Sequence, residues 1–145
     1  MPTARRSRTI AAPAEELWDL IDDPHHLPRW WPRVDRVEDV DGEAFTEVMR
    51  TSKGKLVRAD FRVLREQAGR TLTWQQQLEG TPFGRLLSEA STRVTLEPQE
   101  RGTRVTLELH QRLTGFFPRF GGFMVSRAAA RTLDEALDGL ERIGG

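Results

Sequence analysis

The side chains that could carry acid–base or metal chemistry are few and scattered along the chain. Cysteine and tyrosine are absent, and there are three histidines. Thiol nucleophiles and cysteine-ligated metal sites are therefore excluded. His25 and His26 follow Asp22 and Asp23, but adjacent histidines in a turn seldom converge on one ion. We expect no metal site and interpret these residues as solvated helix caps.

Three polar side chains are expected on the inner faces of the elements that carry them. Arg127 falls within an apolar helical stripe, where a guanidinium would hold a carboxylate or phenolate. Alternatively, its stem snorkels or it pairs with a strand carboxylate. Gln76 and Gln111, on separate strands, offer amide hydrogen bonds to a ligand carbonyl, or they mark a cavity mouth or satisfy each other. His110 lies on the opposite face of its strand, unless a one-residue bulge reverses it.

Composition and missing motifs exclude several classes of protein. Lys plus Arg and Asp plus Glu each number 22, so the net charge is zero, which argues against nucleic acid or an anionic membrane surface as partner. No phosphate loop, nucleophile elbow or dinucleotide fingerprint is present, and we expect no cofactor. No run approaches the ~18 apolar residues of a membrane span. With no export signal recognised, a cytoplasmic protein without integral membrane association is expected.

Alternating apolar and polar residues predict an antiparallel sheet through most of the chain. Its inner faces include alternate residues of each strand, such as Phe61 with Val63 and Trp74 with Gln76. Asp41-Gly42 is a strong hairpin signal. The expected strands are residues 5–12, 33–42, 43–52, 55–66, 70–80, 85–99 and 103–114.

Helical patterns occur before and after most of these strands. Residues 13–23 predict a short helix with Leu17, Trp18 and Ile21 on its buried side. Residues 115–145 have the length of one long helix, kinked or frayed early by Pro118 and two glycines. Its stripe is expected to run through Phe116, Phe120, Phe123 and Ala130 to Leu137.

Between the first helix and the second strand lies "HHLPRWWPRV", residues 25–34, with two adjacent tryptophans between prolines. The prolines restrict this segment to a short helical turn or a tight corner. At least one of Trp30 and Trp31 is expected to pack under the long helix. A structural plug is the favoured interpretation for each indole, and ligand contact is the alternative.

The order of these elements resembles the helix-grip fold. "APAEELWDLIDDPHHLPRWWPRV" looks like the opening of the START-like branch of the polyketide cyclase/dehydrase and lipid-transfer superfamily (SRPBCC), and "GTRVTLEL" is similar to its penultimate element. The resemblance covers essentially the whole chain. It implies a single α+β domain over residues 1–145, in which a curved antiparallel sheet of about six or seven strands wraps around a long C-terminal helix, with two short helices after the first strand.

The resemblance also implies an apolar cavity between the sheet and the long helix, which side chains could instead fill. The tryptophan corner, strand parity and helix phase together supply the expected lining: Trp30, Trp31, Phe61, Val63, Trp74, Gln76, Ala90, Thr92, Leu107, Leu109, Gln111, Phe120, Phe123, Met124 and Arg127. Trp74 would stack on a planar ligand or simply fill the core.

The functional hypothesis is binding or transport of a hydrophobic small molecule: a lipid, a quinone or a polyketide-like compound. One alternative is an aromatase/cyclase in which Arg127 stabilises an enolate of a polyketide intermediate. A second is an interaction module like the Hsp90-activator branch. No tyrosine and no inward acid–base pair can be recognised, which favours the carrier and leaves enzymatic activity an open question.

Overall fold

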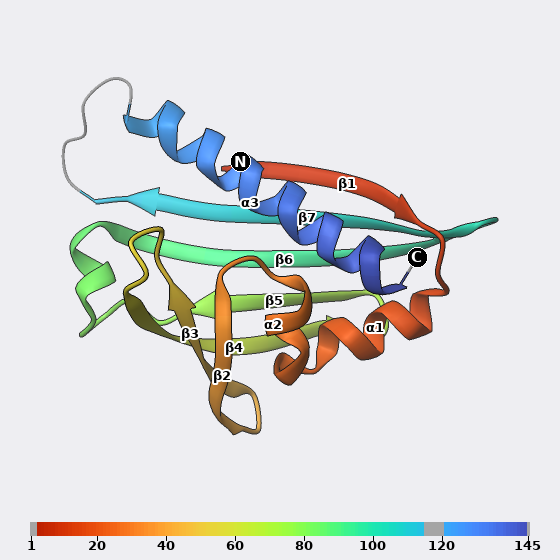
Figure 1. Cartoon of the computed structure of the whole chain (residues 1–145), viewed down its shortest axis with the longest axis horizontal. Helices are drawn as coiled ribbons and strands as arrows, with labels where there is room; N and C mark the ends of the chain where they lie inside the picture. Colours follow the sequence, from red (N-terminus) through yellow and green to blue (C-terminus); the bar gives the residue numbers. More distant parts are fainter. Residues whose placement is uncertain (1–2, 115–120, 145) are drawn as a thin grey trace.

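A computed structural model describes residues 3–114 and 121–144. These residues form a seven-stranded antiparallel sheet in the order β1-β7-β6-β5-β4-β3-β2 (Figure 1). Strands β2 to β7 form a meander, and β1 joins beside β7. The strands are β1 Ala4–Ile10, β2 Val34–Asp41, β3 Ala44–Arg50, β4 Leu56–Gln67, β5 Thr71–Gln76, β6 Leu87–Gln99 and β7 Gly102–Leu113.

The alternation expected from the sequence determines which side chains face inward. On β6, Ala90, Thr92, Val94 and Leu96 are buried, whereas the residues between them are exposed or half-buried. The β2–β3 hairpin turns at the predicted Asp41–Gly42, and Gly42 takes the positive φ of 60° that a glycine adopts without steric cost. One face of the sheet is therefore apolar and must be covered.

Short helices follow β1 and close one end of the sheet. Helix α1, Ala14–Asp22, buries Leu17, Leu20 and Ile21. Asp23 then caps the 3₁₀ turn η1, Pro24–His26, by accepting a hydrogen bond from the backbone N–H of His25 at 3.0 Å. Helix α2, Leu27–Trp30, follows at once. Of the two alternatives expected for this segment, a short helical turn or a tight corner, the structure shows a helical turn that ends at Trp30.

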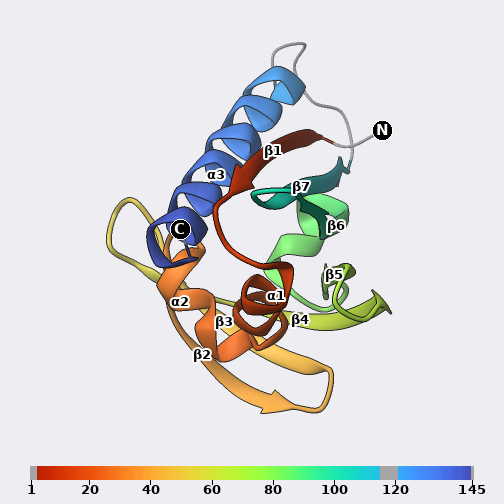
Figure 2. The same ribbon diagram turned by 90° about the vertical axis from the view of Figure 1, so that its right-hand side faces the viewer.

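Helix α3, Gly121–Gly144, packs on the concave side of the sheet (Figure 2). Its buried side chains are Ala129, Leu133, Ala136, Leu137 and Leu140. Charged residues also join it to β1: Arg6 lies 3.3 Å from Asp134, and Arg8 lies 2.6 Å from Asp138. The predicted stripe residues Phe116 and Phe120 lie outside the described residues. None of the described helices is long and apolar enough to cross a membrane.

A glycine fixes how closely α3 approaches the tryptophan corner. Any Cβ at Gly139 would collide with the backbone carbonyl oxygen of Trp30. Glycine thus allows the backbones of α2 and α3 to touch. Sheet, short helices and gripped C-terminal helix together form the helix-grip fold that the sequence predicts.

Candidate functional site

A cavity of about 370 Å³ lies between the sheet and the N-terminal half of α3. Five consecutive strands of the sheet, β3 to β7, contribute to its wall, and α3 contributes residues at helical spacing. Its lining comprises Trp31, Glu47, Met49, Phe61, Gln76, Phe83, Leu87, Ala90, Ser91, Thr92, Leu109, Gln111, Val125, Ala128, Ala129 and Thr132. The cavity that the resemblance implies is therefore present.

Small side chains explain why this region is not filled. Ala90 and Thr92 on β6 line the cavity from the sheet, and the buried Ala129 and the exposed Ala128 line it from α3. An alanine reaches no further than its Cβ, so alanines on both layers leave the two layers separated by unfilled volume.

Seven of the predicted lining residues do line this cavity: Trp31, Phe61, Gln76, Ala90, Thr92, Leu109 and Gln111. Val63 and Leu107, which were expected beside them, are each at most 1% exposed and belong to the packed core. Phe120 lies outside the described residues, and so does the side chain of Phe123. Ligand contact by any of these side chains stays a prediction.

Two helix predictions need correction. Met124 is 67% exposed, and Arg127 is also exposed; neither lines the cavity. The cavity face of α3 runs instead through Val125, Ala129 and Thr132. Arg127 is two residues from Ala129, which is about 200° around a helix of 3.6 residues per turn. The sequence analysis took Phe120 and Phe123 to mark the inner face of the helix and extended that face to Arg127. The face that lines the cavity is rotated away from it.

The adjacent tryptophans have different environments. Trp30 is 2% exposed and packs against Trp74, with ring centroids 5.7 Å apart. Trp31 is half-buried, lies 5.4 Å from Trp30 in an edge-to-face arrangement, and reaches the cavity. Trp30 and Trp74 are thus core residues rather than cavity lining, and the plug expected under the long helix is Trp30.

Among the described residues that line the cavity, Glu47 is the one that can ionise, and sequence reasoning missed it. It is 6% exposed, and burial raises its pKa to about 8. It lies on the inner face of β3 between Phe45 and Met49, at the same parity. That alternation was visible in the sequence, but no inner face was assigned to this strand. A glutamate between two large apolar residues at period two was the missed signal.

The histidines take no part in this cavity. His25 Nδ1 lies 2.8 Å from Asp23 Oδ1 at the exposed cap of η1, as the solvated-cap interpretation expects. His110 lies 3.2 Å from Glu108 and is not a lining residue. Within the described ranges, no group of histidine and acidic side chains could hold a metal ion.

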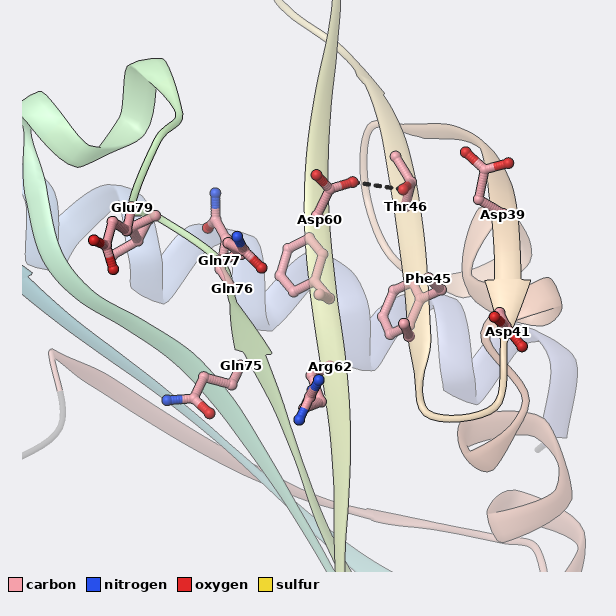
Figure 3. Close-up of a pocket in the computed structure, with 13 residues that line it drawn as sticks. Asp39, Asp41, Phe45, Thr46, Asp60, Arg62, Gln75, Gln76, Gln77 and Glu79 are labelled. Carbon is pink, nitrogen blue, oxygen red and sulfur yellow. Dashed lines mark hydrogen bonds between the residues drawn. The ribbon is translucent and has the colours of Figure 1, made fainter.

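A second, wider hollow is lined mostly by residues of the outer face of the sheet, and it shares Phe61 and Gln76 with the inner cavity; in Figure 3, α3 lies behind the strands. Its volume is about 790 Å³. Its wall is polar, with Asp39, Asp41, Asp60 and Glu79 as its acidic side chains, and Asp60 accepts a hydrogen bond of 2.6 Å from Thr46. A solvated, polar depression of this kind lacks the apolar enclosure that small-molecule sites use. The smaller inner cavity is therefore the candidate site.

Several solved structures share the fold. A START superfamily protein from Mycobacterium smegmatis matches with a TM-score of 0.77 and 16% identity, over 97% of this chain and 94% of that chain. A protein from Thermus thermophilus matches with a TM-score of 0.72 and 25% identity, over 96% and 94%. The di-domain ARO/CYC StfQ of the steffimycin biosynthetic pathway matches with a TM-score of 0.78 and 13% identity, over 97% of this chain and 49% of that one.

None of the curated proteins matches the sequence. At the level of families, the sequence model described as "Polyketide cyclase / dehydrase and lipid transport" matches residues 1–143. That match spans every described strand and nearly all of the gripping helix. The chain therefore belongs to the polyketide cyclase / dehydrase and lipid transport family.

Proposed function

We propose that this protein binds and carries a hydrophobic small molecule, such as a lipid, quinone or polyketide-like compound, in the cavity between the sheet and α3. The observation that carries the proposal is the mostly apolar wall, with a few polar groups among aromatic and aliphatic side chains. Pockets for small ligands have this composition. The volume of about 370 Å³ is near the lower end of the usual range, which favours a compact ligand.

A cyclase is a second candidate, and Glu47 is the observation that favours it. Cyclisation of a poly-β-ketone needs a group that exchanges protons within the cavity, and a carboxyl with a pKa of about 8 is suited to that work near neutral pH. Arg127 is not available to stabilise an enolate there, because it lies on the exposed side of α3. The carrier remains the primary proposal because a single carboxyl with no second acid or base beside it provides no proton relay in the described lining.

Native mass spectrometry of the purified protein, followed by organic extraction, tests the proposal. We expect an apolar molecule bound one to one. Ala128→Phe, at the exposed edge of the cavity, should reduce its recovery severalfold, because the ring obstructs entry of the ligand. Ala44→Phe makes the same substitution on the opposite, exposed face and lines the polar hollow, so it should leave recovery unchanged.

The outcomes separate the candidates. A ligand lost equally from both variants would not occupy the inner cavity, and an empty protein that also takes up no uncharged fluorescent probe would contradict the proposal. Incubation with a poly-β-ketone substrate distinguishes the two functions: a carrier returns the compound unchanged, whereas a cyclase converts it into an aromatic product.

A further inference from the structure

The register of β3 places Glu47 between two apolar residues of the adjacent strands. It pairs with Val37 of β2 and with Ala59 of β4. Its side chain lines the cavity, although only 6% of the residue is exposed. Burial is the sole cause of its raised pKa, with no contribution from a hydrogen bond or a charge among the described residues. Glu47 is thus a buried carboxyl whose partner is not supplied by the described part of the chain.

The composition of the cavity determines the state of this carboxyl. Of the described residues that line the cavity, Glu47 alone can ionise. A carboxylate there would have no cation beside it among the described residues and would be largely removed from bulk water, so the protonated form is favoured. Protonated Glu47 carries an O–H group, which is a strong hydrogen-bond donor. Leaving that donor unpaired is costly, and a ligand atom that accepts the hydrogen bond removes the cost.

We propose that Glu47 donates a hydrogen bond to a carbonyl or hydroxyl oxygen of the bound molecule, and that the ligand is an uncharged, mostly apolar compound carrying such an oxygen. This inference rests on the proposed function, because it requires a ligand in the cavity. Gln76 and Gln111 line the same cavity, and their amides supply further donors for a second oxygen on the ligand.

The same geometry selects against anionic ligands. The carboxylate of a fatty acid would enter a space whose described lining contains no cation and already holds a carboxyl. Arg127, the cation that the sequence suggests for this role, is exposed on the far side of α3. Desolvating an anion without a counter-ion is strongly unfavourable. Ketones, quinones and alcohols are therefore the ligand class, in preference to fatty acids.

Two fluorescent probes test this inference. Prodan is an uncharged naphthyl ketone whose emission moves to longer wavelength when its carbonyl accepts a hydrogen bond, and diphenylhexatriene is a hydrocarbon without oxygen. Glu47→Leu should weaken prodan binding about tenfold and shift its bound emission to shorter wavelength, because the donor is lost. Diphenylhexatriene should bind this variant as well as it binds the wild type, or more tightly.

Two further variants make the comparison specific. Glu47→Gln retains an N–H donor at the same place, so prodan affinity should return to within about threefold of the wild type. Glu89→Leu replaces an exposed glutamate on β6 and should change neither probe. Parinaric acid, an anionic fluorescent fatty acid, should bind the wild type more weakly than prodan does.

Each adverse result points to a different failure. If Glu47→Leu binds prodan with wild-type affinity and unshifted emission, Glu47 does not recognise the oxygen, although the cavity still binds ligands. Tighter binding of parinaric acid than of prodan would overturn the ligand class. If the wild type binds none of the three probes, the proposed function fails and this inference fails with it.

Discussion

The two halves of α3 cover the same sheet, but the C-terminal half packs against a filled core and the N-terminal half lines a cavity. The C-terminal half places Leu133, Leu137 and Leu140 against the core, each at most 1% exposed. The N-terminal half presents Val125, Ala128, Ala129 and Thr132 to the cavity. Leucine side chains and the close contact at Gly139 fill the space beneath the C-terminal half of α3. The small alanine side chains leave the cavity beneath the N-terminal half. The difference shows that one amphipathic helix can both stabilise the fold and line a binding site, according to side-chain size along its stripe.

Substitution of the adjacent tryptophans should give the largest difference in stability between the packed end and the cavity end of the molecule. Trp30→Ala removes a ring that is 2% exposed, and it should lower the free energy of unfolding by about 3–5 kcal/mol. Trp31→Ala removes a half-buried ring at the cavity, so its cost should be about 1–2 kcal/mol. Chemical denaturation of both variants measures the difference. Equal losses would mean that the two ends are packed alike.

Glu47 should make stability depend on pH in a direction opposite to that of an ordinary salt-bridged carboxylate. Its pKa is about 8 in the folded protein and near the ordinary value of 4.5 when unfolded. Between these values the folded state holds one proton more than the unfolded state, so stability declines as pH rises, by up to about 1.4 kcal/mol per pH unit. Below about pH 4.5 and above about pH 8 this contribution is flat.

Urea denaturation between pH 5 and 8 measures that slope. Glu47→Gln cannot ionise and should remove this decline, whereas Glu89→Gln, at an exposed position, should retain it. Other titrating groups affect all three proteins alike, so the difference between variants isolates Glu47. A decline of the same size in Glu47→Gln would show that Glu47 is ionised and solvated in the folded state.

Gly139→Ala should lower the stability of the protein by an intermediate amount, because it disturbs the contact between α2 and α3. Alanine favours a helix over glycine by about 1 kcal/mol, but its Cβ would collide with the Trp30 carbonyl oxygen and separate α2 from α3. We expect a net loss of about 2 kcal/mol, measured by thermal or chemical unfolding. Glu135→Ala, at an exposed position of the same helix, should change stability little. A stabilised Gly139→Ala protein would contradict the close contact.

The inward-facing residues of the strands were predictable from the sequence because side chains alternate between the two faces. The apolar residues of each strand identify its inner face without reference to any other element. Phe61, Gln76, Thr92 and Leu109 all line the cavity as their parity predicts. Glu47 was equally accessible by parity, but a single glutamate in a strand is ordinarily solvent-facing. Its neighbours on the same face, Phe45 and Met49, indicate otherwise.

The helix was harder to predict, because its phase must be carried through several turns from an anchor. An anchor on Phe120 and Phe123 places Arg127 on the inner face, whereas Val125 and Ala129 are the residues that line the cavity. An error of one or two residues rotates a helical side chain by about 100–200°. The sequence also could not predict which inward-facing residues line the cavity and which are buried in the core. Val63 and Leu107 have the same strand parity as the cavity residues, yet both lie in the filled core.

Arg127→Ala should have the smallest effect, and it tests the phase of α3 directly. Because Arg127 is exposed and does not line the cavity, its removal should change stability by less than about 0.5 kcal/mol and leave prodan affinity within about twofold. Thr132→Arg, on the cavity face, should instead obstruct ligand uptake and weaken prodan binding severalfold. If Arg127→Ala weakened binding while Thr132→Arg did not, α3 would present the face that Phe120 and Phe123 predict. The open end of the molecule would then be a cationic pocket suited to anions, and Glu47 would have a counter-charge rather than a ligand oxygen as its partner.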